Sequence, residues 1–252
     1  MKGPLALPRK LFLLAMALVP IVAGSLWWGP ALLRHMAWTT VRRVEVVGTV
    51  YVAPDAVLKL AGIRPQASVF DDFADVEARV VTNPLIARAR IRPRGLRTVR
   101  IEVEELVPVA LAPTPVLKPV LGDGTILPLD PARARVDLPV LTASVDVREG
   151  RLVGGDGLRA LQSFAHVHRH DPGLAAIVSE VRTAPGGGIA LTLVESEEAT
   201  EIWLPADPDE AVLRRVRATL ADLQRRHWSA RYVEARFAGQ VVVKLNPSTK
   251  AS

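Results

Sequence analysis

The chain of 252 residues contains no cysteine. That absence excludes a disulfide framework, a thiolate zinc site, an iron–sulfur cluster and a cysteine nucleophile. Aromatic residues make up only 5% of the chain, too few for a platform that stacks the bases of a single-stranded nucleic acid. Lysine is also scarce, so the net charge of +6 is carried mainly by arginine. A basic balance is compatible with nucleic acid, anionic lipid or acidic protein as a partner and selects none of them.

Apolar residues, in contrast, are plentiful. They make up 49% of the chain, and charged residues make up 23%. This composition is sufficient for a packed core and excludes global disorder. The length allows one large domain or two small ones after any targeting segment.

An uncharged run of 23 residues extends from Leu11 to Leu33. As a helix it would be about 35 Å long, enough to cross a hydrocarbon core of about 30 Å. Basic residues precede it and tryptophans cluster at its far end, as at a membrane interface: Lys2, Arg9, Lys10, then Trp27, Trp28 and Trp38. We predict a membrane helix with the N-terminus in the cytoplasm and the remaining chain exported.

Two alternatives to a retained anchor exist. A cleaved signal peptide would use the shorter core from Leu11 to Val22, with cleavage before Gly24. The apolar stretch continues for ten residues past Ala23, which favours the anchor. A buried core helix is disfavoured because core helices seldom run so long without a charge.

The segment from Val41 to Val103 alternates between strand and helix patterns. Residues 41–47 alternate as a strand, Pro54 opens a short helix through Leu60, and Asn83-Pro84 ends a second helix. Two period-two runs then flank Pro93-Arg94-Gly95 and predict an antiparallel hairpin with one solvated face. The order strand, helix, helix, strand, strand predicts helices packed on a small sheet.

After a proline-rich connection the pattern changes to short strands with two helices. Gly122-Asp123-Gly124 and Gly186-Gly187-Gly188 predict turns. Asp156 is expected to cap one helix, and Asp207-Pro208-Asp209-Glu210 to start the other. Strands are expected over 177–181, 189–194, 200–204, 232–237 and 240–245.

The sequence supports no active site. His166, His168 and His170 could place two imidazoles on one helix face, but spacing supplies no third metal ligand. Structural or surface histidines are therefore favoured over a metal site. The glycine turns lack a phosphate-binding pattern, and no Gly-x-Ser-x-Gly occurs. We predict no catalytic, cofactor-binding or metal-binding residue.

Six arginines lie between Arg88 and Arg100 without an acidic residue among them. They could bind lipid headgroups, nucleic acid or acidic protein. The simpler interpretation is the solvated face of a hairpin, partly offset by Glu102 and Glu104. Nucleic acid is disfavoured for an exported domain.

The final strand, Gln240–Leu245, is apolar and free of proline. A terminal strand often lies at a sheet edge, where unpaired backbone groups accept a strand from another chain. The alternative is a strand paired on both sides within this chain. The pattern alone leaves both open.

The ordered motifs resemble a known family. VRRVEVVGTVYVAPDAVLKLAGI and IARARIRPRGLRTVRIEVEELVPVAL resemble the POTRA domain of the bacterial division protein family FtsQ/DivIB. LGDGTILPLD with LPVL resembles the start of that family's β domain, and ARYVEARFAGQVVVKL its last two strands. The resemblance implies an α+β fold with an N-terminal transmembrane helix, a β-α-α-β-β POTRA domain, and a mixed β domain with two helices and an exposed C-terminal edge strand. The implied limits are 1–10 (cytoplasmic), 11–33 (membrane), 41–110 (POTRA), 116–245 (β domain) and 246–252 (tail).

The resemblance also implies a function. A member would be a non-enzymatic, single-pass scaffold of the inner membrane at the division septum, without cofactors, that binds FtsB/DivIC-type and FtsL-type partners by strand addition. Arg236 matches an arginine that pairs with an acidic partner residue, Phe237 and Gly239 match turn positions that contact the partner, and Val241 and Val243 would lie on the seam. Where the family often has Asp-Leu before that arginine, this chain has Glu234-Ala235. The alternatives are a POTRA-containing envelope protein for outer-membrane protein export or assembly, and a metal-dependent hydrolase that uses the histidines.

Overall fold

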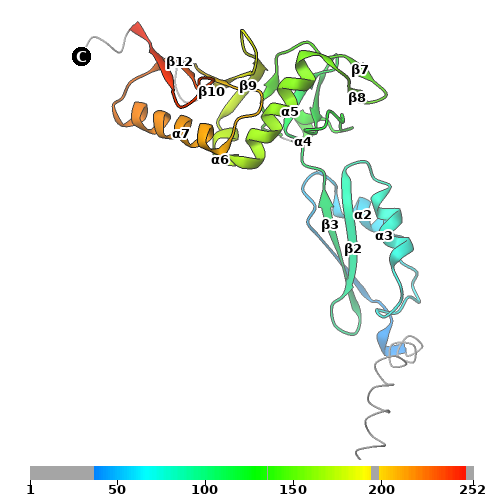
Figure 1. Cartoon of the computed structure of the whole chain (residues 1–252). Helices are drawn as coiled ribbons and strands as arrows, with labels where there is room; N and C mark the ends of the chain where they lie inside the picture. Colours follow the sequence, from blue (N-terminus) through cyan, green and yellow to red (C-terminus); the bar gives the residue numbers. More distant parts are fainter. Residues whose placement is uncertain (1–36, 135, 194–198, 248–252) are drawn as a thin grey trace, which may run out of the picture. The chain divides into compact units, whose positions relative to one another are not determined.

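The computed structural model describes residues 37–134, 136–193 and 199–247. The expected cytoplasmic segment 1–10, the expected membrane helix 11–33 and residues 248–252 of the expected tail lie outside these ranges. Within them, no helix combines the length and the apolar character needed to cross a membrane. The described residues divide into two compact units, with the boundary between Glu105 and Leu106 (Figure 1).

The first unit places two helices on a three-stranded sheet. After the short 3-10 helix η1 (Ala37–Thr39) come β1 (Arg43–Val47), α2 (Pro54–Ala61), α3 (Ala74–Val81), β2 (Ile86–Pro93) and β3 (Thr98–Glu105). The sheet order is β1-β3-β2, with β1 parallel and β2 antiparallel to β3. The predicted order of elements and the predicted hairpin are confirmed.

Apolar side chains from both layers form the core of this unit. Val57 of α2, Val80 of α3, and Val99 and Ile101 of β3 are fully buried. In β2 the alternation continues outward, because Arg88, Arg90 and Arg92 are exposed while Ala89 and Ile91 are buried. The hairpin therefore has one dry and one wet face, as predicted from its period of two.

A buried carboxylate closes the first unit. Glu105, the last residue of β3, is only 9% exposed. Its oxygens accept hydrogen bonds from the backbone N–H groups of Val50 at 3.0 Å, Tyr51 at 2.7 Å and Val52 at 3.0 Å. Glu105 thus supplies the acceptors that the loop between β1 and α2 needs, since buried N–H groups are costly without partners.

The second unit is built on an eight-stranded sheet of order β13-β12-β11-β10-β9-β6-β4-β5. Its strands are β4 (Ala110–Pro113), β5 (Leu117–Val120), β6 (Val140–Leu141), β9 (Val178–Thr183), β10 (Ile189–Leu193), β11 (Thr200–Leu204), β12 (Ala230–Glu234) and β13 (Val242–Leu245). Two short strands, β7 (Val147–Arg148) and β8 (Arg151–Leu152), form a separate two-stranded sheet. The Gly186–Gly188 segment connects β9 and β10, so the predicted turn there is confirmed.

Two long helices, α5 (Gly155–His170) and α7 (Glu210–Arg225), lie on one side of this sheet (Figure 1). They bury Phe164 and Leu213 in one cluster with Val181, Leu191 and Val233 from the sheet. Two one-turn helices, α4 (Pro131–Ala134) and α6 (Pro172–Ala175), accompany them. The two long helices were therefore predicted correctly, whereas the two short helices were not predicted.

The predicted starts of both long helices need correction. α7 begins at Glu210, and its cap is Asp209, whose carboxylate accepts from the N–H of Val212 at 2.7 Å. Asp209 has the extended backbone that an N-cap requires, so Asp207 is not the cap. α5 is capped by Gly154, and Asp156 lies in its first turn, where a negative charge is favourable at the helix N-terminus.

Candidate partner-binding edge

The last strand, β13, forms one edge of the large sheet. It pairs antiparallel with β12, and Val243 faces Val233 while Val242 faces Glu234. Within the described residues, β12 is the only strand beside it. The other long side of β13 is therefore a row of backbone groups available for pairing.

The direction of these groups follows from one hydrogen bond. The N–H of Asn246, directly after β13, donates to the carbonyl oxygen of Ser229 at 3.0 Å. Backbone groups along a strand point alternately to its two sides. The N–H groups of Val242 and Lys244 therefore point toward β12, and those of Val243 and Leu245 point to the open side.

The side chains of this edge divide between two faces. Val241, Val243 and Leu245 are partly buried and pack against the core of the second unit. Val242 and Lys244 are exposed on the opposite face. The side chains of Val241 and Val243 thus anchor the strand on the core. The backbone N–H of Val243 points to the open side of the sheet.

The opposite edge of the sheet, β5, is different. Pro119 within β5 has no N–H to donate, and its carbonyl oxygen already accepts from the N–H of Leu127 at 2.8 Å. Proline and a covering segment are common ways to block an edge. The two edges therefore differ, and β13 is the one suited to pairing.

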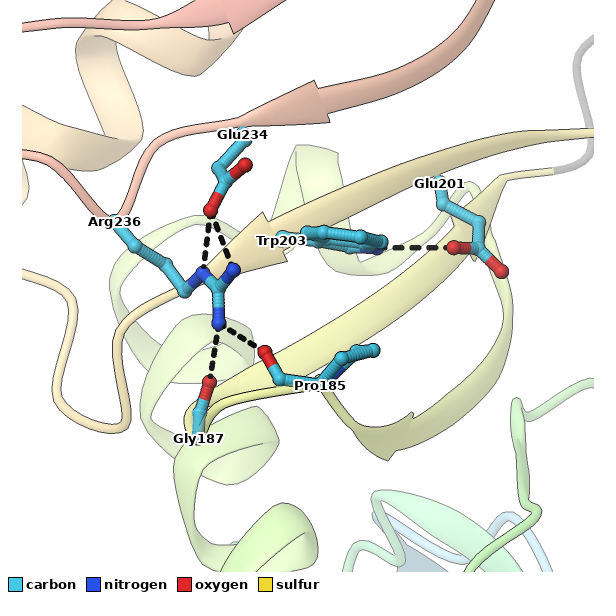
Figure 2. A network of polar contacts seen from close by, with 6 residues as sticks. All are labelled: Pro185, Gly187, Glu201, Trp203, Glu234 and Arg236. Atoms are coloured by element: carbon cyan, nitrogen blue, oxygen red, sulfur yellow. Dashed lines mark hydrogen bonds and ion pairs between the residues drawn. The ribbon is translucent and has the colours of Figure 1, made fainter.

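Arg236 lies in the loop between β12 and β13 and contacts three separate parts of the unit (Figure 2). Its Nε donates to Oε1 of Glu234 at 2.9 Å, and its Nη1 donates to the carbonyl oxygen of Gly187 at 3.0 Å. Nη1 also donates to the carbonyl oxygen of Pro185 at 2.5 Å, and the guanidinium lies 5.2 Å from the ring centroid of Trp203. Arg236 therefore ties the β12–β13 loop to the β9–β10 turn.

Phe237 and Gly239, the two other predicted site residues, lie in the same loop. The side chain of Phe237 is 52% exposed. Gly239 is exposed and has a φ of +73°, and the space where a Cβ would stand is open. Both positions are accessible in the loop that leads into β13, whereas Arg236 is largely enclosed.

The exposed face of the sheet carries an aromatic and charged row that was not predicted from the sequence. The rings of Trp203 and Tyr232 stack at 4.8 Å, and Nζ of Lys244 lies 5.8 Å from the centroid of Tyr232. These residues share a face because β11, β12 and β13 place them in neighbouring registers. The sequence pattern that could have indicated this row is Glu201-Ile202-Trp203. In a strand it places Glu201 and Trp203 on one face and the buried Ile202 on the other.

Glu201 is the anion of this row. Partial burial disfavours its charge, but hydrogen bonds from Arg182 at 2.6 Å and from Nε1 of Trp203 at 2.9 Å outweigh that cost, as do the charges of Arg182 and Arg231. The pKa of Glu201 is therefore lowered. A depression of about 490 Å³ lies over these groups and is also lined by Tyr232 and Lys244. Three cationic side chains and one carboxylate line this depression, so it favours the binding of acidic side chains.

The histidines of α5 do not assemble a metal centre in the described ranges. The rings of His166 and His170 lie 4.3 Å apart, and Nδ1 of His166 lies 3.4 Å from Oδ1 of Asp207. No group of three histidine, aspartate or glutamate side chains positioned to hold a metal occurs in the part of the chain that the structure describes.

The fold and the open edge define a class: a POTRA-type unit followed by a mixed sheet whose last strand has one neighbouring strand among the described residues. A family model described as "POTRA domain, FtsQ-type" matches residues 39–105. The chain is 30% identical to a cell division protein FtsQ from Rhodothermus marinus, over 97% of this chain and 91% of the relative. It is 23% identical to a cell division protein FtsQ from Syntrophotalea carbinolica, over 92% of this chain and 83% of the relative. The chain belongs to the FtsQ family of cell division proteins.

Proposed function

We propose that this chain is a non-enzymatic, bitopic scaffold of the division machinery that captures FtsB/DivIC-type and FtsL-type proteins at the septum. The observation that carries the proposal is the open side of β13, where the N–H groups of Val243 and Leu245 point away from β12. A partner strand would extend the sheet through these groups, and its affinity would come mainly from backbone hydrogen bonds.

Side chains around the edge would provide specificity. Phe237 offers exposed apolar area in the loop that leads into β13, and Gly239 leaves room for close approach. Lys244 and the depression at Tyr232 and Arg231 favour a partner strand with acidic residues on that face. Val241 and Val243 would keep the edge in register by packing their side chains on the core.

We assign Arg236 two roles in this scheme. Its contacts with Gly187 and Glu234 hold the loop next to the edge, and its side chain keeps 22% of its area exposed. A partner carboxylate could approach that exposed part. Pairing with an acidic partner residue is thus proposed for Arg236 in addition to positioning the loop.

The uncharged run from Leu11 to Leu33 would anchor the chain in the inner membrane, with residues 1–10 in the cytoplasm and both compact units outside. We propose residues 41–110 as the POTRA domain, which recruits other division proteins, and residues 116–245 as the partner-capturing β domain. Membership of the FtsQ family favours this function over the alternative of outer-membrane protein export or assembly.

The decisive variant is Val243→Pro. It removes an N–H that points to the open side and leaves those that bond to β12. Co-purification with the FtsB-type and FtsL-type proteins of the same organism should weaken about tenfold or more, because one partner carbonyl loses its donor. Val243→Thr, which keeps the N–H and a similar shape, is the matched control and should bind normally.

Undiminished binding by Val243→Pro, in a protein with an unchanged unfolding transition, would refute the strand-addition mechanism. A fluorescent fusion of the full chain tests the cellular role separately. It should gather at the septum of dividing cells, whereas a uniform envelope signal would favour the export alternative.

A further inference from the structure

A cluster of arginines and exposed apolar side chains lies at the end of the first unit where the chain enters it. We call this surface the entry end, and it consists of Trp38, Arg42, Arg43, Arg94, Leu96 and Arg97. The N–H groups of Arg42 and Arg43 donate to the carbonyl oxygen of Arg97 at 2.8 and 3.1 Å. Figure 1 shows the β2–β3 turn beside the start of β1. Residues more than fifty positions apart therefore form one continuous surface.

In the described part of the chain, two of the three shaft arginines of the hairpin pair with a carboxylate, whereas one of the four entry-end arginines does. On the shaft, Arg88 lies 3.4 Å from Glu104 and Arg92 lies 3.6 Å from Glu102. Among the residues that the structure describes, Arg42, Arg43 and Arg97 form no ion pair with a carboxylate. The shaft thus fits the interpretation of a balanced solvated face, whereas the entry end keeps uncompensated positive charge.

The nearby carboxylate does not neutralise this charge. Glu45 of β1 accepts from Arg100 at 3.1 Å, and Arg94 lies 3.6 Å from the same oxygen. Glu45 therefore already pairs with two arginines, and its single negative charge does not compensate Arg42, Arg43 and Arg97. Nε of Arg97 donates to the carbonyl oxygen of Trp38 at 3.3 Å, which leaves its other donors and its charge without a carboxylate among the described residues. A surface with several guanidinium groups that lack a carboxylate partner binds phosphate well, since the guanidinium matches phosphate geometry with paired donors.

Apolar side chains accompany the charges. Trp38 is 42% exposed and Leu96, at the tip of the β2–β3 turn, is 51% exposed. Indole rings favour the boundary between headgroups and hydrocarbon. Arginine with exposed tryptophan and leucine is a combination suited to the surface of a bilayer, where the positive charges meet anionic headgroups and the apolar groups enter the interface.

The position in the chain brings this surface to the membrane. Trp38 follows Leu33, the end of the uncharged run, by five positions, and five extended residues span at most about 17 Å. We propose that the entry end binds the phosphate groups of anionic lipids in the bilayer that holds the anchor, and so fixes the orientation of the POTRA domain on the membrane. This inference rests on the proposed membrane anchor.

The absence of cysteine allows a direct test. Single-cysteine variants Leu96→Cys and Val50→Cys of the full chain are labelled with a fluorophore and inserted into phosphatidylcholine nanodiscs with or without phosphatidylglycerol. A nitroxide on the lipid headgroups serves as the quencher. Val50 is 79% exposed and lies beyond the far end of β1, so it reports the same unit away from the entry end.

We expect strong quenching at position 96 and weak quenching at position 50, and the difference should require phosphatidylglycerol. The double variant Arg42→Gln with Arg43→Gln should weaken the binding of the entry end to the bilayer surface about 30-fold. Each arginine near an anionic surface contributes a factor of about five. Arg88→Gln with Arg92→Gln, which removes the same charge from the paired shaft, is the matched control and should leave quenching nearly unchanged.

Equal quenching at both positions, no dependence on phosphatidylglycerol, or equal effects of the two double variants would overturn the inference while the anchor stands. Failure of the full chain to enter nanodiscs would overturn the anchor and this inference with it. Neither result affects partner capture at β13, which is measured independently.

Discussion

Arg236 holds Glu234 through two guanidinium nitrogens, Nε at 2.9 Å and Nη2 at 2.5 Å (Figure 2). The side chain of Glu234 is only 10% exposed and that of Arg236 is 22% exposed. The pair therefore lies mostly out of water, at the junction of β12 with the loop that leads to β13. It links the stability of the unit to the shape of its open edge.

Arg236→Ala should destabilise the protein by about 3 kcal/mol, because it leaves a nearly buried carboxylate without its partner. Urea unfolding followed by circular dichroism measures this free energy. Replacing Glu234 with alanine as well removes the stranded charge, so the double variant should recover part of the loss. A single variant as stable as the parent protein would show that the pair contributes little.

Glu105→Ala should cost about 3 kcal/mol, since three N–H groups of the β1–α2 loop lose a charged acceptor. Glu104→Ala is the matched control, because Glu104 is 64% exposed and pairs with Arg88 at the surface. Its effect should stay within about 0.5 kcal/mol. Equal losses of unfolding free energy in the two variants would contradict the assigned role of Glu105.

Gly188→Ala should destabilise the β9–β10 turn strongly. A Cβ there would lie 2.1 Å from the carbonyl oxygen of Leu204, and φ is +80°. Gly187→Ala also has a positive φ, +102°, but its Cβ would meet open space, so only the backbone strain of about 1 kcal/mol applies. In thermal unfolding, the midpoint temperature of Gly188→Ala should lie well below that of Gly187→Ala. The reverse order would exclude the close approach to Leu204.

Glu201 predicts a pH dependence of stability. Its pKa in the folded protein is below the ordinary value of 4.5, so the folded state binds fewer protons than the unfolded chain near that pH. The stabilisation is complete above 4.5 and is lost as the pH falls through the folded pKa. The difference in unfolding free energy between the parent protein and Glu201→Gln should therefore shrink from pH 7 to pH 3. A constant difference across that range would contradict the charge-stabilised state of Glu201.

Local patterns predicted much of the fold. The alternation of arginines with Ala89 and Ile91 gave the correct face of β2, and the glycines at 186–188 correctly marked a turn. The start of α7 was misplaced because Asp207 and Asp209 both fit a cap motif, and only the backbone distinguishes them. Such choices depend on packing of the preceding segment, which the local sequence does not encode.

The site was less accessible to prediction. The contact of Arg236 with Gly187 joins positions 49 apart in the sequence, and the stacking of Trp203 on Tyr232 requires the parallel pairing of β11 with β12. No spacing rule reports such pairs. Glu105 looked like one charge in an acidic strand, and only its inward position in β3 explains its burial.

The most direct test of partner capture is hydrogen exchange at single amides, measured by NMR on the full chain in detergent with and without the FtsB-type protein. The N–H groups of Val242 and Lys244 point to β12 and should exchange slowly in both samples. Those of Val243 and Leu245 should exchange fast alone and become slow in the complex, as a new strand supplies acceptors. A complex that forms while exchange at Val243 and Leu245 stays fast would contradict strand addition at β13.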